Sequence, residues 1–349
     1  QELGFLANTL SFSVMDQQIL NLKKINSSTY YGSGQIKSIS NKISTLGCEH
    51  IIFNDDISPS QYKNIQGILD KKIKIFDRTG VILEIFKRNA KTKESKLQVE
   101  LASLQYMLPR LTGQWTHLER QMGGVGTRGG PGEKQIEIDR RLIGVRISKL
   151  KKDLLNIKKN RKTQASGRKN IFRVSLVGYT NAGKSSLLNA LTEPNTAYVK
   201  NKLFATLDTT TKSVQILKNK RVLVTDTVGF IKNLPHNLVA SFRSTFEEVD
   251  NSDLILTVVD SSQSKDGVKE HISTIENTLT QMHVRVLNNI LIFNKLDLIK
   301  ESGSINYLKK KYPDSIFISA KNHIMTEKVK EAIAEVLSVN QKIRVIKVP

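Results

Sequence analysis

The chain has 349 residues, a length that suggests two or three domains. Hydrophobic residues make up 39% and no apolar run reaches the roughly 18 residues that a membrane span needs, which argues against a membrane-spanning protein. With Cys48 as the only cysteine an intrachain disulfide is excluded, and 54 Lys and Arg against 32 Asp and Glu give a formal charge of +22, which points to a polyanionic partner.

The first ninety residues combine short strand-like and helix-like segments. Residues His50–Asn54 and Lys72–Asp77 are rich in β-branched and aromatic residues and are typical of strands. Between them, Ser58–Leu69 predicts a helix, with Ser58 as N-cap and Pro59 in the first turn. We therefore expect a small α/β domain over residues 1–93.

Residues 94–169 predict a helical hairpin. Apolar residues recur at steps of three and four, which is typical of two amphipathic helices that each bury one stripe. The stripes are Leu97, Leu101, Leu104 and Leu108, then Ile136, Ile143, Ile147, Leu150, Leu154 and Ile157. The loop between them, Gly123–Glu133, has six glycines and one proline, more than a tight turn requires.

The second helix and the linker after it carry much of the charge. Residues Glu133–Asn170 contain 13 Lys and Arg against 4 Asp and Glu. Like charges four residues apart on a helix repel one another, and a polyanion offsets that repulsion, so we favour a nucleic-acid-binding face over a merely solvated one. The candidate RNA contacts are Gly123, Gly124, Gly126, Arg128, Gly129, Gly130, Lys151, Lys152, Lys158 and Lys159.

A phosphate-binding loop opens the region 170–340. The apolar strand Phe172–Val177 runs into Gly178–Ser185, GYTNAGKS, and a helical segment follows. Glycines at these positions let successive backbone N–H groups curl around phosphates at the positive end of the helix. Lys184 would bridge the outer phosphates and the Ser185 hydroxyl would ligate Mg²⁺.

A second motif follows the next strand, Arg221–Thr225. It reads Asp226-Thr227-Val228-Gly229, which would place Asp226 in the Mg²⁺ shell and the Gly229 N–H at the γ-phosphate. A threonine before this motif is expected to complete the metal shell. The residues alone leave four candidates open, namely Thr206, Thr209, Thr210 and Thr211.

The remaining motifs set the identity of the base. Strand Ile290–Phe293 ends at Asn294-Lys295-Leu296-Asp297, where Asp297 can accept from both N1–H and the 2-amino group of guanine. Adenine offers neither donor and would leave the carboxylate unpaired. Lys295 would lie over the base, Asn294 would tie its loop to the phosphate loop, and the Ala320 N–H would reach guanine O6. Together the motifs predict a GTP-hydrolysing P-loop GTPase domain with a mixed, mostly parallel sheet.

With these motifs in place, nearly the whole chain resembles the HflX family of translational GTPases. The resemblance rests on "TYYGSGQI" and "DRTGVILEIF" early in the chain, "KLQVELASLQYMLPRLTG" and "GGVGTRGGPGE" in the middle, and "GYTNAGKSSLLNALT", "LFATLDTTT", "DTVGFIKNLPH" and "NKLD" later. It implies Mg²⁺ as cofactor, with Thr206 of the F-A-T segment as ligand. It also implies binding to the large ribosomal subunit and its RNA, and a part in splitting or recycling ribosomes under stress.

The expected site residues form three groups. The catalytic residues are Lys184, Thr206 and Gly229, and the metal ligands are Ser185, Thr206 and Asp226. The nucleotide-binding residues are Gly178, Tyr179, Thr180, Asn181, Ala182, Gly183, Lys184, Ser185, Ser186, Phe204, Ala205, Thr206, Leu207, Asp208, Asp226, Thr227, Val228, Gly229, Asn294, Lys295, Leu296, Asp297, Ser319, Ala320 and Lys321.

Other readings of the same residues stay open. An RNA-binding ribosome-assembly factor could use GTP mainly as a structural switch, whereas a signalling GTPase at a membrane surface is disfavoured by the glycine-loop hairpin. Phe230 stands where many GTPases have a water-orienting Gln, so another group or a partner must position the water.

We expect a cytoplasmic monomer without stable membrane insertion. Because the sequence lacks an initial Met, the possibility that a targeting segment was removed stays open. At the other end we expect only a tail over residues 341–349 in place of a longer C-terminal domain.

Overall fold

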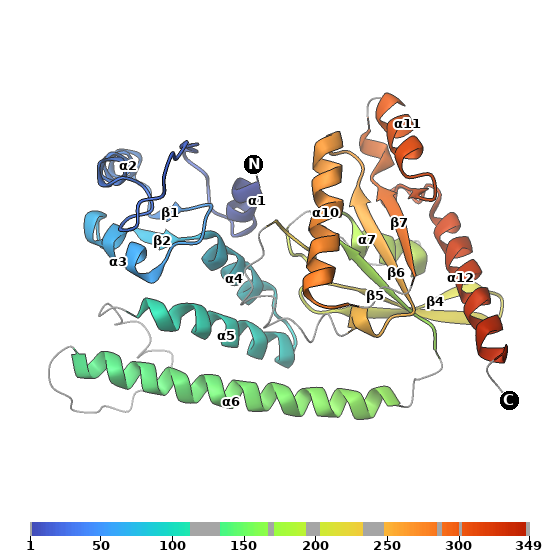
Figure 1. The fold of residues 1–349 in the computed structure, drawn as a ribbon. Coiled ribbons are helices and arrows are strands. Elements are labelled where there is room, and N and C mark those ends of the chain that lie inside the picture. The colour runs from blue at the N-terminus through green and yellow to red at the C-terminus, as the bar shows by residue number, and fades with distance from the viewer. Residues whose placement is uncertain are drawn as a thin grey trace. The chain divides into compact units, whose positions relative to one another are not determined.

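The computed structural model describes residues 2–111, 133–166, 171–192, 203–232, 248–284, 288–299 and 302–346 (Figure 1). The chain divides into two compact units. The first contains residues 1–88 and 96–157, and the second contains residues 89–95 and 158–349. The glycine-rich loop lies outside the described residues.

The first unit opens with a small α/β layer. Strands β1 (His50–Ile52) and β2 (Lys74–Phe76) pair in parallel, so both expected strands are present but shorter. The expected helix between them is also confirmed, because the Ser58 hydroxyl accepts from Gln61 N at 3.2 Å and Pro59 opens the helix. The helices of this layer are α1 (Glu2–Thr9), α2 (Ser33–Leu46), α3 (Pro59–Ile68) and α4 (Arg78–Asn89).

A helical hairpin forms most of the rest of the first unit, and its two ends, residues 93–95 and 158–166, are assigned to the second unit. It consists of α5 (Lys93–Met107), a 3-10 helix at Leu108–Arg110 and the long α6 (Glu133–Ser166). The expected apolar stripes meet, since Leu101 and Leu104 form one buried cluster with Ile143 and Leu150. The partly buried members are Leu97, Leu108, Ile147 and Leu154, while Ile157 lies outside the cluster and the Ile136 side chain is not among those described.

A buried ion pair fastens the hairpin to the strand layer within this unit. The Asp77 carboxylate accepts from Arg110 Nη2 at 2.9 Å and from Tyr106 Oη at 2.6 Å. It also accepts from the backbone N–H of Gly80 at 2.8 Å. Burial raises the pKa of Tyr106 far above its ordinary value, so the phenol stays protonated and acts as a donor.

The second unit is built on a six-stranded sheet with the order β4-β5-β3-β6-β7-β8. Only β4 is antiparallel to its neighbour, and every other pairing is parallel, which confirms the mixed, mostly parallel sheet. The strands are β3 (Arg173–Gly178), β4 (Thr210–Leu217), β5 (Lys220–Asp226), β6 (Leu254–Asp260), β7 (Asn289–Asn294) and β8 (Ile316–Phe317).

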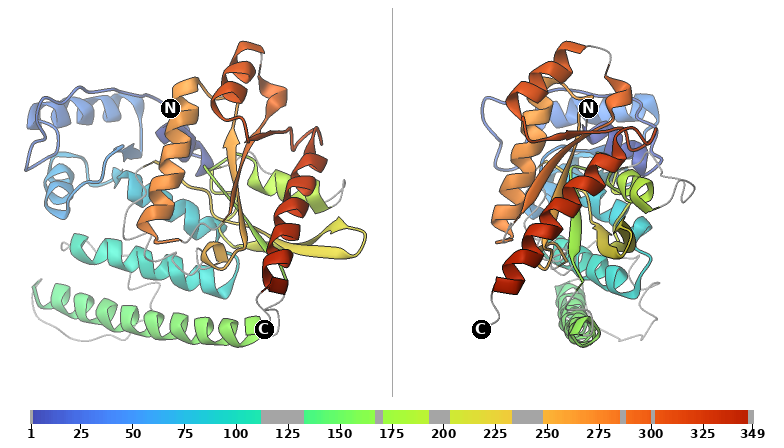
Figure 2. Two further views of the ribbon diagram at one scale, coloured as in Figure 1. Left: turned by 45° about the vertical axis from the view of Figure 1, so that its right-hand side comes forward. Right: turned by 90° about the vertical axis from the view of Figure 1, so that its right-hand side faces the viewer.

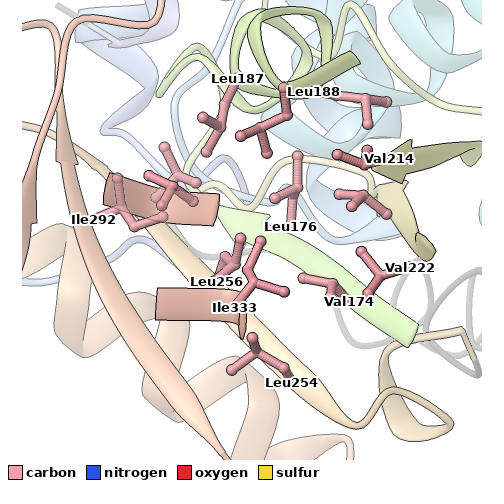
Figure 3. Close-up of a cluster of buried hydrophobic side chains, with 14 of the residues drawn as sticks. Val174, Leu176, Leu187, Leu188, Val214, Val222, Leu254, Leu256, Ile292 and Ile333 are labelled. Atoms are coloured by element: carbon pink, nitrogen blue, oxygen red, sulfur yellow. The ribbon is translucent and has the colours of Figure 1, made fainter. Parts of the chain in front are cut away.

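Helices cover both faces of this sheet (Figure 2). Helices α7 (Lys184–Thr192) and α12 (Thr326–Ile346) pack on one face, and α10 (Lys265–Gln281) packs on the other, with α11 (Ser302–Lys311) between β7 and β8 in the chain. Alternate residues of the fully buried β6 therefore enter different cores. Figure 3 shows the core under α7 and α12, with Val174, Leu176, Leu187, Leu188, Val214, Val222, Leu254, Leu256, Ile292 and Ile333.

The last helix corrects one expectation. We expected the segment from 341 onward to be a separate tail, but α12 continues without a break through Ile346. Residues 341–346 contain neither Gly nor Pro, so nothing in the local sequence stops the helix. None of the helices in the described ranges is long and apolar enough to cross a bilayer.

Candidate functional site

The phosphate loop connects the end of β3 to the start of α7. It turns through left-handed backbone at Asn181, with φ of 61°, and at Gly183, with φ of 94°. A Cβ atom on Gly183 would lie 2.2 Å from Asn294 Nδ2, so only glycine fits there. The loop is thus packed directly against the start of the base-recognition motif.

Lys184 is a buried cation folded over this loop. Its side chain is 6% exposed, and Nζ donates to the carbonyl oxygens of Gly178 and Tyr179, each at 3.0 Å. Burial lowers the pKa of Lys184 to about 8, and the Asp226 carboxylate opposes that shift. An anion beside Nζ would offset this desolvation, as the phosphates of a nucleotide would.

Three oxygen-bearing side chains from different elements converge next to Lys184. Ser185 Oγ donates to Asp226 Oδ2 at 2.6 Å, Thr206 Oγ1 donates to the same oxygen at 2.9 Å, and the two hydroxyls lie 2.8 Å apart. Asp226 Oδ1 is buried and has no hydrogen-bond partner within the described part of the chain. Burial raises the pKa of Asp226, while the Lys184 ammonium opposes the rise.

This cluster fits a hard divalent cation that is shared with a nucleotide. One carboxylate and two hydroxyls are oxygen donors of the kind Mg²⁺ prefers, and the carboxylate has an unused oxygen. Across the described ranges no group of three or more His, Cys, Asp or Glu side chains could hold a metal alone. Protein-bound Mg²⁺ commonly takes its remaining ligands from substrate phosphates and water.

The contacts in the structure distinguish Thr206 from Thr210 and Thr211. Thr206 is the one whose hydroxyl contacts both Ser185 and Asp226. Thr210 begins β4, and the Thr211 hydroxyl lies 2.9 Å from that of Thr225 on the neighbouring strand. Thr206, the residue that the family resemblance implies, therefore lies beside Ser185 and Asp226, and its role as a metal ligand stays a proposal.

Gly229 and Phe230 lie directly against the phosphate loop. Thr180 N donates to Phe230 O at 2.7 Å, and Phe230 N donates to Gly178 O at 3.0 Å. A Cβ atom on Gly229 would lie 2.8 Å from Thr180 Cα, so a larger residue would push the two segments apart. The Phe230 ring is 1% exposed and offers no hydrogen-bonding group for a water molecule.

The base-recognition motifs are joined by the buried Asn294. Its Nδ2 donates to Ala182 O at 2.9 Å, and its Oδ1 accepts from Ala320 N at 2.9 Å. The three motifs expected to bind one nucleotide are thus brought together. The Ala320 N–H, which we expected to reach guanine O6, is engaged here by Asn294 instead.

Asp297 and Lys295 flank the place expected for the base. Asp297 is exposed, and Ser319 Oγ donates to its Oδ1 at 2.5 Å. Lys295 Nζ donates to Asp260 Oδ2 at 2.7 Å. Burial alone would raise the pKa of Asp260, but the Lys295 ammonium and hydrogen bonds from Ser262 bring it below its usual value.

Sequence reasoning missed Asp260. It ends the fully buried strand β6 and is in register with Asn294 at the end of β7. The sequence could have indicated Asp260 as a site residue, because it is an acidic residue at the carboxyl end of an apolar strand. Ligands of open α/β sheets bind at that edge.

Three family models match successive parts of the chain. They are described as GTP-binding GTPase N-terminal over residues 1–87, GTP-binding GTPase Middle Region over residues 89–168 and 50S ribosome-binding GTPase over residues 173–295. The GTPase HflX of Magnetococcus marinus is 45% identical over 304 residues, which cover 86% of this chain and 69% of that protein. The chain belongs to the HflX family. The Escherichia coli GTPase HflX is 37% identical, covering 88% of this chain and 72% of its own length.

Solved structures of GTP-binding proteins have a similar fold. A GTP-binding protein from the archaeon Sulfolobus solfataricus in complex with GDP is 26% identical, with a TM-score of 0.50 over 97% of this chain and 94% of that one. The complex of SsGBP with GDP is also 26% identical, with a TM-score of 0.54 over 96% of this chain and 94% of that one. This HflX-family protein is accordingly a GTPase that hydrolyses GTP.

The other expected nucleotide-binding residues of this HflX-family chain differ in exposure and in hydrogen bonding. Phe204 and Leu207 are each 2% exposed and Thr227 is fully buried, so their side chains pack within the protein. Burial alone would raise the pKa of Asp208, but hydrogen bonds from Thr92, Ser95 and the Lys91 backbone lower it. Ser186 and Val228 lie on the motifs already described, Ala205 and Lys321 are exposed, and Leu296 N donates to Ile318 O at 3.2 Å.

The expected RNA contacts are only partly described. Lys151, Lys152 and Lys159 are exposed on α6, whereas Lys158 is half-buried. The loop residues Gly123, Gly124, Gly126, Arg128, Gly129 and Gly130 lie outside the described residues.

Proposed function

We propose that this HflX-family GTPase binds the large ribosomal subunit and its RNA, and that GTP hydrolysis times its release during ribosome splitting or recycling under stress. The observation that carries the proposal is the match of residues 173–295 to a 50S ribosome-binding GTPase family. The exposed lysines of α6 support it, because they offer positive charge to RNA phosphates. In this proposal the protein acts in the cytoplasm and is a monomer when free.

In the proposed nucleotide complex, the two ends of GTP are held by different motifs. Lys184 exchanges its bonds to the Gly178 and Tyr179 carbonyls for bonds to the β- and γ-phosphates, and the Gly229 N–H donates to the γ-phosphate. Asp297 is the acceptor for guanine and already lies exposed beside Ser319. The full set of nucleotide-binding residues expected from the sequence stays a proposal.

Ser185, Thr206 and Asp226 are the proposed Mg²⁺ ligands. The unused, buried Asp226 Oδ1 is the observation that supports this role. When bound, Mg²⁺ would neutralise charge on the phosphate oxygens. The protein side chains supply one carboxylate charge and two hydroxyls, so metal and nucleotide are expected to bind together.

We also propose that intrinsic hydrolysis is slow, because of Phe230. Its buried ring occupies the position next to Gly229 and has no group that could orient water. The Thr180 hydroxyl is buried beside Gly229 and has no hydrogen-bond partner among the described residues, so it is one protein group available there. We propose that bound ribosomal subunits complete the arrangement.

Turnover of GTP, measured with and without purified large subunits, tests this function. We expect stimulation by about tenfold or more, which corresponds to roughly 1.4 kcal/mol of barrier. Small subunits at the same concentration serve as the control for general RNA effects. Nucleotide-dependent binding to large subunits without faster turnover would instead favour an assembly factor that uses GTP as a structural switch.

A further inference from the structure

The segment that contains Thr206 is anchored on both sides by a distant part of the chain. Two residues before Thr206, Phe204 O accepts from Asn89 Nδ2 at 2.7 Å. Two residues after it, Asp208 Oδ2 accepts from the backbone N–H groups of Lys91 at 2.9 Å and Thr92 at 3.2 Å. The anchoring residues precede this segment by 115 to 117 positions, yet they belong to the same compact unit.

The second anchor is also the cap of a helix. Thr92 Oγ1 donates to Asp208 Oδ1 at 2.5 Å and accepts from Ser95 N at 3.1 Å, so Thr92 caps the first turn of α5. Asp208 therefore places a carboxylate at the N-terminal end of α5, where backbone N–H groups lack partners within the helix. Its bonds are of the stronger, charge-assisted kind because a carboxylate accepts them.

These contacts restrict the backbone on both sides of Thr206. Thr206 can contact Ser185 and Asp226 only if the backbone on either side holds its position, and each anchor removes freedom from that backbone. The same carboxylate holds the start of α5, the helix that leads to the glycine-rich loop. Asp208 therefore connects the backbone beside Thr206 directly to the cap of α5.

We propose that Asp208 is a positioning residue that holds Thr206 at the Mg²⁺ site and makes the first turn of α5 sensitive to the bound nucleotide. The proposal rests on the proposed role of Thr206 as a Mg²⁺ ligand. Coupling of this kind is reciprocal. Nucleotide with Mg²⁺ tightens the hold on Lys91 and Thr92, and a firmly held α5 cap favours nucleotide with Mg²⁺ by the same factor.

Amide hydrogen exchange measures the anchor without measuring activity. In the parent protein with Mg²⁺, exchange in a peptide that spans residues 90–95 should be slower with a non-hydrolysable GTP analogue than with GDP. In Asp208→Asn the difference should shrink, because the amide carries no charge and keeps only one of the two acceptor oxygens. Asp266→Asn is the matched control, since Asp266 is 95% exposed in the first turn of α10 and its carboxylate pairs with Lys269.

Magnesium titration of GTP turnover tests the positioning step. Asp208→Asn and Thr92→Val should each raise the Mg²⁺ concentration for half-maximal turnover by about tenfold. A shift of that size corresponds to the loss of one charge-assisted hydrogen bond. Thr92→Ser keeps the hydroxyl and should behave like the parent. In Thr206→Ala, adding Asp208→Asn should cause no further shift, because Asp208 acts through Thr206.

The outcomes distinguish a failure of the positioning role of Asp208 from a failure of Thr206 as metal ligand. Unchanged exchange and an unchanged Mg²⁺ requirement in Asp208→Asn would overturn the positioning role, as would shifts that add fully to those of Thr206→Ala. If Thr206→Ala itself leaves the Mg²⁺ requirement unchanged, the proposed metal ligand is wrong and the positioning role falls with it. The exchange experiment would then still report whether the anchor on α5 exists.

Discussion

Asn294 donates a hydrogen bond to the carbonyl oxygen of Ala182 across 2.9 Å. This bond joins the base-recognition loop after β7 to the phosphate loop after β3. Because Asn294 also accepts from Ala320 N, one buried amide holds three segments that are far apart in the sequence. In the proposed nucleotide complex, recognition of the base and of the phosphates is therefore linked through this amide.

Replacing Asn294 with Ala should weaken GTP and GDP binding together. The change leaves the Ala182 carbonyl and the Ala320 N–H without their partner in a buried position, and each such loss costs roughly 1–3 kcal/mol. We expect both affinities to fall by about tenfold or more in titrations with fluorescent nucleotides. Asn64→Ala is the matched control, because the Asn64 side-chain amide donates to Ser28 in the first unit. Equal affinities in the two variants would contradict the linking role.

Asp297→Asn should change which base is accepted. The amide would present a donor to the guanine 2-amino group, itself a donor, whereas it can donate to the 2-oxo group of xanthine. We expect GTP affinity to fall strongly and xanthosine triphosphate to bind better than it does to the parent. The direct test is competition between the two nucleotides, and a variant that still prefers GTP as the parent does would refute the assignment.

The sequence predicted those parts of the site that are local in the chain. Gly178–Ser185 is a strand, a loop and a helix in succession, so the motif alone specifies its shape, and the periodic leucines and isoleucines specify α5 and α6. The β4 strand was not predicted, because its polar and exposed residues give little apolar alternation. The partnership of Asp260 with Lys295 depends on β6 and β7 being neighbours, and the bond from Thr92 to Asp208 spans 116 residues, so neither could be found without the topology.

Thr206→Ala should impair hydrolysis while Thr209→Ala should not. Thr206 bonds to Ser185 and Asp226, which are the proposed metal ligands, and its hydroxyl has no substitute in the alanine variant. The measurement is GTP turnover at saturating GTP across a range of Mg²⁺ concentrations, where a higher Mg²⁺ requirement is expected for Thr206→Ala. Normal turnover in Thr206→Ala with loss in Thr209→Ala would move the metal ligand to Thr209.

Asp77→Ala should destabilise the first unit without preventing GTP binding. The side chains of Asp77 and Arg110 are 3% and 15% exposed, so the change leaves a buried guanidinium without its carboxylate, at a cost of about 3–5 kcal/mol. Asp16→Ala breaks an ion pair in the same unit whose side chains are 37% and 48% exposed, and should cost much less because water screens the pair. Urea denaturation of both variants, followed alongside nucleotide titration, gives the comparison. Similar losses of unfolding free energy in the two variants would show that burial does not determine how much the Asp77–Arg110 pair contributes to stability.

The last prediction concerns the lysines of α6. Lys151, Lys152 and Lys159 are exposed on this helix, whereas Lys158 is half-buried, so the three exposed residues are the cleaner set to neutralise. Their joint replacement by Gln should weaken co-sedimentation with large ribosomal subunits. It should also reduce the slope of log affinity against log salt by about two, because each phosphate contact in single-stranded nucleic acid contributes roughly 0.7.

A triple variant with the same change of charge elsewhere separates this effect from net charge. Lys309, Lys310 and Lys311 are exposed at the end of α11 in the second unit, and their replacement by Gln removes the same three charges. If α6 is the RNA-binding face, the α6 variant loses affinity and salt dependence, the α11 variant keeps both, and GTP affinity in the absence of ribosomes is the same in the two. Equal losses in the two variants would mean that overall charge attracts the protein to ribosomes, and that α6 has no special part in binding.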